Sequence, residues 1–213
     1  MSSPIPIVHI VDDDKAYRTS VGRLVEASGF RSACYESGTE FLARLPIEEP
    51  GCILLDLRMP GLGGLELQDR LAEAAPLLPI VFLTGHGDIE TTVRAIKAGA
   101  EDFLEKTASS SALLAAIERA MYRYQQRAIE HEHGVMLQTL VASLTQRESV
   151  VFNLIVRGKR NKQVAYELGT SERTVKAHRR SIMEKLGAQS LAELVSIAEQ
   201  LGLLDHSATP HKP

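Results

Sequence analysis

The sequence IVFLTGHGDIETTVRAIKAGAEDFLEK, at residues 80–106, has two short apolar runs on either side of an amphipathic segment. The runs at 80–83 and 102–104 have the length of buried strands, whereas segment 89–98 has apolar residues three and four positions apart, as in a helix. A strand, a helix and a second strand in this order form the unit from which parallel sheets are built. The stretch therefore predicts two parallel strands joined by a helix.

The same alternation extends through the first 120 residues. Further predicted strands lie at 7–11, 31–35 and 52–55, and further predicted helices lie at 16–28, 39–45, 64–74 and 111–124. Five strands alternating with five helices predict a doubly wound α/β domain with a five-stranded parallel sheet. In such sheets, ligands bind beyond the carboxyl ends of the strands.

Polar residues with phosphoryl-transfer chemistry end four of these strands. Clustered carboxylates repel one another unless a cation joins them, and Mg²⁺ prefers such hard oxygen ligands. A hydroxyl and an ammonium group could then hold the oxygens of a phosphoryl group. Each feature alone is ordinary at a strand end, but together they favour a site. They are Asp12, Asp13 and Asp14 after the first strand, Asp56 after the third, Thr84 after the fourth and Lys106 after the fifth.

The sequence beyond residue 143 predicts an all-helical region. Thr145 and Glu148 form a capping box that opens a helix ending near Gly158. Three more helices are expected at 161–168, from Ser171 to 186 and at 190–201, with a Gly169 turn after the first of these. A helical linker over 126–143, weakened near Gly134, precedes the region. Two short helices joined by a glycine turn predict a helix-turn-helix.

The helix after Ser171 has two unlike faces. Val175, Ile182 and Leu186 form an apolar face, while the opposite arc carries Arg173, Lys176, Ala177, Arg180 and Glu184. Long cationic side chains around a small residue suit the major groove of DNA, although most charged helix faces are simply solvated. Residues 144–213 carry a net charge of +4 and the remainder −7, which favours a polyanionic partner for the C-terminal region.

The composition limits the class of protein. With 213 residues, 44% of them hydrophobic, and no apolar run that could cross a bilayer, the chain is expected to be a cytoplasmic protein of one large or two small domains with no membrane association. The acidic N-terminus is unlike a signal peptide. Cys34 and Cys52 are expected to be buried, reduced thiols, and residues 205–213 a disordered tail.

Residues 5–125 resemble the receiver domain of two-component response regulators through the motifs IVDDD, LLDLRMPGLGGLEL, IVFLTGHGD and AIKAGAEDFLEK. The resemblance implies that Asp56 is the phosphoacceptor and that Lys106 is its ion-pair lysine. It implies that Mg²⁺ is held by Asp12, Asp13, Asp56 and the main-chain carbonyl of Arg58. It also implies that Thr84 and Phe103 are switch residues, and that Arg58 and His86 influence phosphoryl lifetime.

One position departs from this family's pattern. Receivers usually have proline after the lysine, with a cis peptide bond, whereas this chain has Lys106-Thr107. A cis bond before a residue other than proline costs about 2.5–4 kcal/mol, so a trans bond is expected here. The loop 107–111 is then free to follow another path, which leaves the reach of Lys106 and the extent of phosphorylation open.

Residues 144–204 resemble the LuxR-type DNA-binding domain of the NarL/FixJ family, through LTQRE, GKRNKQVAYELGTSERTVKAHRRSIMEKLG and SLAELV. The resemblance implies that Lys176, Ala177 and Arg180 face the bases. It implies that Arg173, His178, Thr145, Asn161 and Lys162 contact the DNA backbone or support such contacts. For the helix at 190–201 it suggests pairing with a second copy, although its apolar residues could instead be core.

The predicted protein is a transcriptional regulator, not an enzyme, with a receiver at 1–125, a linker at 126–143, a DNA-binding domain at 144–204 and a tail at 205–213. Its expected partners are a sensor histidine kinase, double-stranded DNA and a second copy of itself. An alternative is a receiver that acts as an unphosphorylated dimerisation module. A Mg²⁺-dependent phosphohydrolase would need a second carboxylate near the nucleophile, where Asp56-Leu57-Arg58 supplies a cation.

Overall fold

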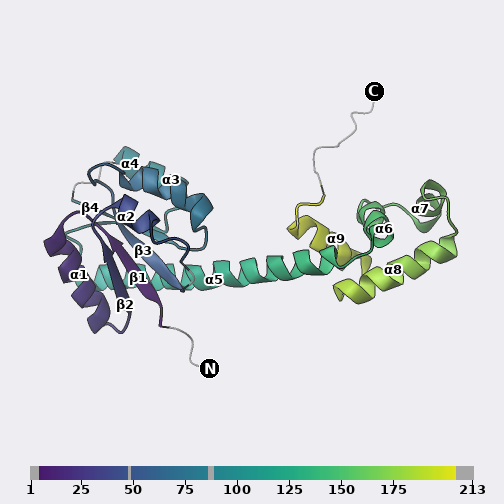
Figure 1. Cartoon of the computed structure of the whole chain (residues 1–213), viewed down its shortest axis with the longest axis horizontal. Helices are drawn as coiled ribbons and strands as arrows, with labels where there is room; N and C mark the ends of the chain where they lie inside the picture. The colour runs from purple at the N-terminus through teal and green to yellow at the C-terminus, as the bar shows by residue number, and fades with distance from the viewer. Residues whose placement is uncertain (1–4, 48, 86–88, 205–213) are drawn as a thin grey trace. The chain divides into compact units, whose positions relative to one another are not determined.

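The structure, a computed structural model, describes residues 5–47, 49–85 and 89–204, so the predicted tail at 205–213 and His86 lie outside the described residues. The chain divides into two compact units, Met1–Ile129 and Glu130–Pro213. The first is an α/β domain and the second is helical (Figure 1). Among the described residues, no helix has the length and apolar character needed to cross a membrane.

The strands of the first unit form a single parallel sheet. Its order is β2-β1-β3-β4-β5, with every neighbouring pair parallel. The strands are β1 (Ile7–Val11), β2 (Arg31–Tyr35), β3 (Gly51–Asp56), β4 (Ile80–Thr84) and β5 (Asp102–Glu105). This order is that of a doubly wound fold. The chain builds the sheet from β1 toward one edge through β2, and from β3 toward the other edge through β4 and β5. The predicted five-stranded parallel sheet is confirmed.

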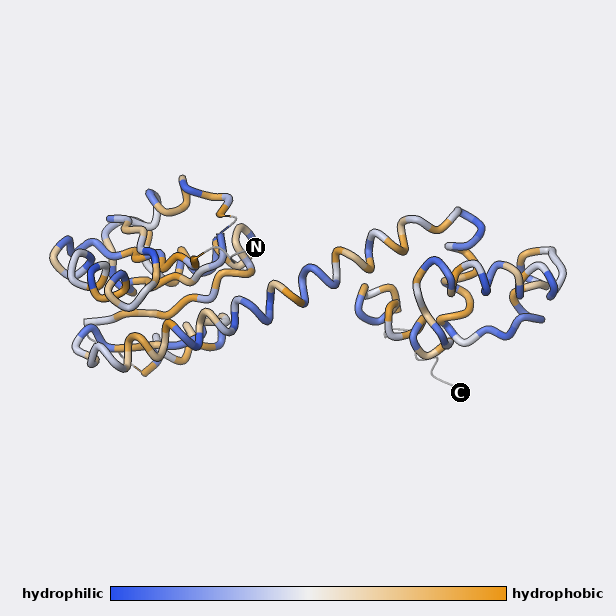
Figure 2. The backbone as a smooth tube through the Cα atoms, turned by 90° about the horizontal axis from the view of Figure 1, so that it is seen from below, coloured by the Kyte–Doolittle hydropathy of each residue, from blue (hydrophilic) through white to orange (hydrophobic). Residues whose placement is uncertain are grey.

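Helices cover both faces of this sheet. One apolar cluster joins the sheet to α1 and α5, and a second joins it to α2, α3 and α4. The helices are α1 (Lys15–Ala27), α2 (Gly38–Leu42), α3 (Gly64–Ala74), α4 (Ile89–Lys97) and α5 (Ser110–Ala142). The central strands β1, β3 and β4 are buried along their whole length and are mostly apolar, as expected for strands covered on both faces. Figure 2 shows orange, hydrophobic segments inside the α/β unit.

The two cysteines differ in burial, which corrects one expectation. Cys52 lies in the central strand β3 and is buried, as predicted. Cys34 lies in β2 and is exposed, whereas the sequence predicted that it would be buried. The reason is that β2 is an edge strand, so an apolar run in the sequence does not ensure cover on both faces there.

A close approach of backbone to backbone fixes the loop after β3. A Cβ atom at Gly64, the first residue of α3, would lie 2.5 Å from the carbonyl oxygen of Asp56. Only glycine permits that distance without a shift of the backbone. The start of α3 therefore packs directly against the end of the strand that carries Asp56.

The second unit contains α6 (Gln146–Val156), α7 (Asn161–Glu167), α8 (Glu172–Leu186) and α9 (Leu191–Gln200) around one apolar core. The predicted capping box at Thr145 and Glu148 is present at the start of α6, and Ser171 caps α8. Gly187 ends α8 in the left-handed conformation, with φ of 65°. The predicted helix-turn-helix therefore corresponds to α7, the turn that follows it, and α8.

Helix α5 is longer and more regular than the sequence indicates. It runs without interruption through Gly134, where the sequence predicted a weakened helix. Leu137 is buried, and Leu140 and Val141 pack against the core of the helical unit. We attribute the continuity of the helix to this packing, because tertiary contacts contribute more to helix stability than a single glycine removes.

Candidate functional site

Three carboxylates and one ammonium group meet at the carboxyl end of the sheet. Asp12 and Asp13 follow β1, Asp56 is the last residue of β3, and Lys106 follows β5. One carboxylate oxygen from each aspartate lies within 4.8 Å of the other two. Segments that are distant in the sequence therefore converge at the edge of the sheet where the topology predicted a site.

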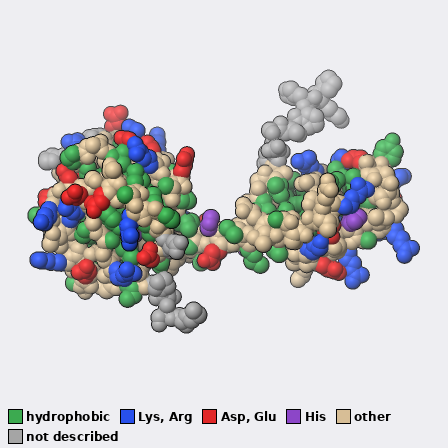
Figure 3. Space-filling model, in the orientation of Figure 1, with side chains coloured by type: hydrophobic (Ala, Val, Ile, Leu, Met, Phe, Trp, Pro, Cys, Tyr) green, Lys and Arg blue, Asp and Glu red, His purple; other side chains and the backbone are tan. Residues whose placement is uncertain are grey.

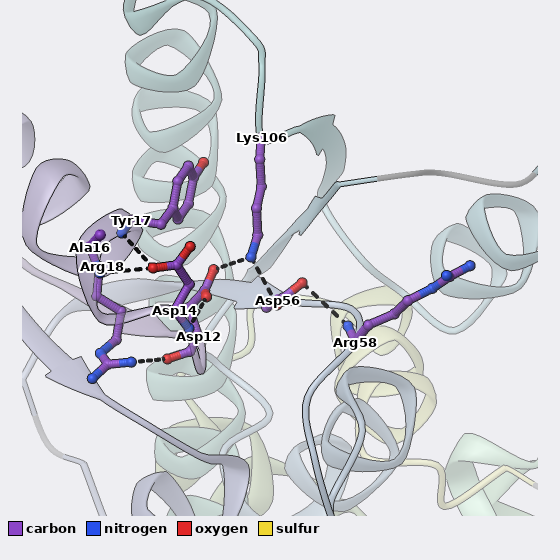
Figure 4. A network of polar contacts seen from close by, with 8 residues as sticks. All are labelled: Asp12, Asp14, Ala16, Tyr17, Arg18, Asp56, Arg58 and Lys106. Atoms are coloured by element: carbon purple, nitrogen blue, oxygen red, sulfur yellow. Dashed lines mark hydrogen bonds and ion pairs between the residues drawn. The ribbon is translucent and has the colours of Figure 1, made fainter.

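Lys106 lies between two of these carboxylates (Figure 4). Its Nζ is 2.7 Å from Asp12 Oδ2 and 2.9 Å from Asp56 Oδ2, and its side chain is 20% exposed. In the described part of the chain the cis peptide bond is Leu45-Pro46, so the bond before Thr107 is trans, as expected. Lys106 therefore reaches both carboxylates although the peptide bond that follows it is trans.

Burial and charge act in opposite directions in this cluster. Burial raises the pKa of Asp12, although the Lys106 ammonium and the Asp14 amide favour its charged form. Burial by itself would lower the pKa of Lys106, but the hydrogen bonds and charges of Asp12 and Asp56 outweigh it and raise that pKa. One ammonium does not balance three carboxylates, so the cluster favours a further cation.

The start of α1 holds the first carboxylates in place. Asp14 caps the helix, and hydrogen bonds from the backbone N–H groups of Tyr17 and Ala16 lower its pKa. The Asp14 N–H donates to Asp12 Oδ1 at 2.8 Å, and Arg18 Nη1 donates to the Asp12 carbonyl oxygen at 2.6 Å. The acidic run therefore combines a helix cap at Asp14 with a buried, fixed carboxylate at Asp12.

The other residues expected to act in the receiver lie in or next to strands β3, β4 and β5. Thr84 is buried at the end of β4, and its carbonyl oxygen accepts a hydrogen bond of 2.7 Å from the Lys106 amide. Phe103 is half-buried in β5, with its ring centroid 6.1 Å from that of Phe82. Arg58 is exposed, and its backbone N–H donates to Asp56 Oδ1 at 3.3 Å.

Helix α8 presents a cationic face. Val175, Ile182 and Leu186 are buried in the core of the helical unit, which confirms the predicted apolar face. The opposite face is exposed and carries Arg173, Lys176, Ala177 and Arg180. In Figure 3, Lys and Arg side chains project around this region. Arg180 forms an exposed ion pair with Glu184, one turn further along the helix.

The remaining residues of the predicted DNA-binding set differ in their surroundings. Thr145 is exposed, and its side chain caps α6, so it has a structural role whether or not it also contacts DNA. Asn161 is half-buried, and its Oδ1 accepts a hydrogen bond of 3.1 Å from Arg179 Nη1. Lys162 is exposed and His178 is half-buried.

Sequence reasoning missed a polar network beneath α8. Glu148 is buried, and it accepts hydrogen bonds from Ser181 and Lys185 at 2.7 and 2.6 Å. Together with Lys185 and Ser181, the Thr145 amide holds the pKa of Glu148 down at about 2. The four-residue spacing of Ser181 and Lys185 places both on one face of α8, which was the signal available in the sequence. The network links α6 to α8.

Comparisons with known proteins agree with this architecture. "Response regulator receiver domain" matches residues 8–118, and "Bacterial regulatory proteins, luxR family" matches residues 142–198. The chain is 40% identical over 205 residues to the transcriptional regulatory protein FixJ of Azorhizobium caulinodans, covering 95% of this chain and 97% of that protein. It is 40% identical over 201 residues to the response regulator protein TmoT of Ectopseudomonas mendocina, covering 94% and 91%.

A solved structure is similar over most of the chain. The low-resolution structure of the response regulator StyR has a TM-score of 0.74 and 45% sequence identity, and the match covers 92% of this chain and 99% of that one.

Proposed function

Because the chain belongs to the response regulators that join a receiver domain to a LuxR-type DNA-binding domain, we propose that a sensor histidine kinase phosphorylates it on Asp56 and thereby controls its binding to DNA. The observation that supports this most is the meeting of Asp12, Asp13, Asp56 and Lys106 at one end of the sheet. We assign the receiver to residues 1–125, the linker to 126–143 and the DNA-binding domain to 144–204, in a protein of the cytoplasm.

The proposed chemistry uses Asp56 as the nucleophile. A carboxylate oxygen of Asp56 attacks phosphorus and forms a new P–O bond, while the bond between phosphorus and the histidine nitrogen of the kinase breaks. The nitrogen keeps the electron pair of that bond and takes a proton. Lys106, which lies 2.9 Å from Asp56 Oδ2, is suited to hold a phosphoryl oxygen, and Thr84 at the next strand end offers a hydroxyl nearby.

The residues present fit a magnesium ion. Three carboxylates from two strand ends supply hard oxygen ligands, and their charge exceeds that of the single ammonium beside them. Asp12, Asp13 and Asp56 would hold the ion, with the main-chain carbonyl of Arg58 as a further ligand. When bound, the ion would neutralise charge on the phosphoryl group during transfer.

Transmission of the signal is proposed to involve Thr84, Phe103 and the surface of α4 and β5. Phosphorylation adds roughly 1.5–2 negative charges at Asp56, and Thr84 and Phe103 would shift toward them. On α4, Ile89 is 84% exposed, and Val93 and Ile96 are nearly half exposed. Burial of such apolar side chains against a second copy of the receiver would favour dimers after phosphorylation.

The DNA-reading part of the proposal assigns Lys176, Ala177 and Arg180 to the base edges. A dimer would bring two α8 helices to paired half-sites at a high effective concentration. Contacts from cationic residues to phosphates would make affinity fall steeply with salt. We expect Lys176→Ala or Arg180→Ala to weaken binding by about 1–3 kcal/mol and to relax specificity at one base pair. The matched control is Arg23→Ala, because Arg23 is an exposed cation on α1.

The experiment that tests the proposal combines Mg²⁺, a small phosphodonor and the full chain. Mass spectrometry would measure phosphate on Asp56, and sizing and DNA binding would be followed on the same samples. We expect one acid-labile phosphate per chain, dimers and tighter DNA binding, all absent in Asp56→Asn. Unchanged DNA binding together with no incorporation of phosphate would contradict the proposal and favour an unphosphorylated dimerisation module. Repeated hydrolysis of the donor with no effect on DNA would favour a phosphohydrolase.

A further inference from the structure

Lys106 has an aromatic neighbour besides its two carboxylate partners. Its Nζ lies 4.9 Å from the centroid of the Tyr17 ring, within the range of a cation–π interaction. Tyr17 is a half-buried residue in the first turn of α1. Figure 4 shows its ring on the α1 side of the pocket, beside the side chain of Lys106.

The position of this ring is fixed by the same segment that fixes Asp12. The Tyr17 amide donates to the Asp14 side chain at 3.1 Å, and the Asp14 amide donates to Asp12 Oδ1. One capped helix turn therefore sets both the buried carboxylate and the ring that faces the ammonium. Burial raises the pKa of Tyr17, which keeps the phenol neutral at physiological pH.

Lys106 has its backbone held by the hydrogen bond to the Thr84 carbonyl oxygen, but its own strand does little to fix its long side chain. It follows β5, a strand of four residues with no fully buried side chain, and Thr107 comes next with a trans bond. Four rotatable carbons lie between the Lys106 backbone and its ammonium. A cation that binds among the carboxylates would compete with the Lys106 ammonium for Asp12 and Asp56. The Tyr17 ring would still attract the ammonium.

We propose that Tyr17 is a positioning residue for phosphoryl transfer, whose ring holds the Lys106 ammonium over Asp56 through a cation–π contact. The proposal rests on the proposed function, since it assigns Lys106 to the phosphoryl group. Tyr17 acts through the face of its ring and through Lys106, and its hydroxyl is not required. Phenylalanine can therefore replace it, but an aliphatic residue of similar size cannot.

The test compares Tyr17→Phe and Tyr17→Leu in the full chain. NMR would record the shifts of the Lys106 methylene protons next to Nζ, which a ring above them moves upfield. Phosphorylation by a small phosphodonor with Mg²⁺ would be followed by mass spectrometry. We expect Tyr17→Phe to keep the upfield shift and most of the rate. Tyr17→Leu should lose the shift and react roughly fivefold to thirtyfold more slowly, the range for a partly desolvated cation–π contact.

Tyr122→Leu is the matched control, because Tyr122 is a tyrosine that is 64% exposed on α5, another helix. It should change neither measurement. The proposal is overturned if Tyr17→Leu keeps the upfield shift of Lys106, or if it is phosphorylated at the wild-type rate while its sheet remains folded by circular dichroism. If the wild-type chain takes up no phosphate, the proposed function fails, and the NMR shift still decides whether the ring holds Lys106.

Discussion

At the scale of single residues, the charge balance around Asp56 gives the clearest expectation. Lys106→Gln would leave Asp12, Asp13 and Asp56 without their cation. Removing one partner of a fully buried pair costs about 3–5 kcal/mol, and the 20% exposure of Lys106 reduces this, so we expect a loss of about 2 kcal/mol in the free energy of unfolding without Mg²⁺. Adding Mg²⁺ should recover part of the loss.

Urea denaturation followed by circular dichroism, with and without Mg²⁺, measures this effect. Lys97→Gln is the matched control, since Lys97 is an exposed lysine at the end of α4. Equal stability of Lys106→Gln and wild type in the absence of Mg²⁺ would show that the ammonium does not neutralise the cluster.

Glu148 gives a second prediction at this scale, for the helical unit. Its pKa is about 2 in the folded chain against an ordinary value of 4.5, because Lys185, Ser181 and Thr145 stabilise the charged form. A depressed carboxyl pKa contributes stability that is fully present above about pH 4.5 and is lost as the pH falls toward 2. Glu148→Gln should therefore lower the unfolding midpoint of this unit at pH 7, and the difference from wild type should shrink between pH 4.5 and 2. A difference that is independent of pH would count against the charged network.

At the scale of elements, α5 allows a prediction about one glycine. A Cβ atom at Gly134 meets no heavy atom within 4 Å, and Gly134 does not have a positive φ. Gly134→Ala should therefore stabilise the chain by about 0.5–1 kcal/mol, because alanine loses less backbone entropy in a helix. The measurement is the urea midpoint of the full chain. A lower midpoint would mean that the helix bends or opens at this residue when the protein is in solution.

The elements also show what the sequence could and could not predict. Strands β1 and β2 and helix α3 have the predicted bounds. A continuous apolar run marks β1, and apolar residues three and four positions apart mark α3, whereas the strand signal of β2 is weaker. The exposure of side chains was harder to predict than the strands themselves. Cys34 lies in a correctly predicted strand but is exposed, because that strand is at the edge of the sheet and strand order is a tertiary property. The continuity of α5 through Gly134 likewise depends on packing that local propensity does not contain.

The candidate site was likewise predictable from the sequence only in part. Asp12, Asp56, Thr84 and Lys106 were found because strand ends of a parallel sheet share one edge. The contact of Tyr17 with Lys106 and that of Glu148 with Lys185 were not, because each joins segments far apart in the sequence without a motif of its own. Such contacts can be recognised only in the folded structure.

At the scale of the whole molecule, the proposed function couples two events, the binding of phosphate at Asp56 and the binding of DNA at α8. Any coupling between two binding sites is reciprocal, so each ligand must change the affinity of the other by the same factor. Beryllofluoride, a reversible mimic of the phosphoryl group, makes this measurable at equilibrium. We expect it to tighten binding of a duplex with two half-sites by about 5–150-fold, the usual range for such coupling.

The duplex should in turn tighten beryllofluoride binding to the receiver by that same factor, measured by calorimetry at one fixed salt concentration because the DNA contacts are salt-dependent. Asp56→Asn is the control, since it lacks the carboxylate that binds beryllium, and its DNA affinity should not respond to beryllofluoride. A duplex with one half-site separates two routes of coupling. If dimerisation carries the signal, the factor should fall to near one on the single half-site, whereas a route within one chain would preserve it. Binding of beryllofluoride that leaves DNA affinity unchanged on both duplexes would refute control of DNA binding by Asp56.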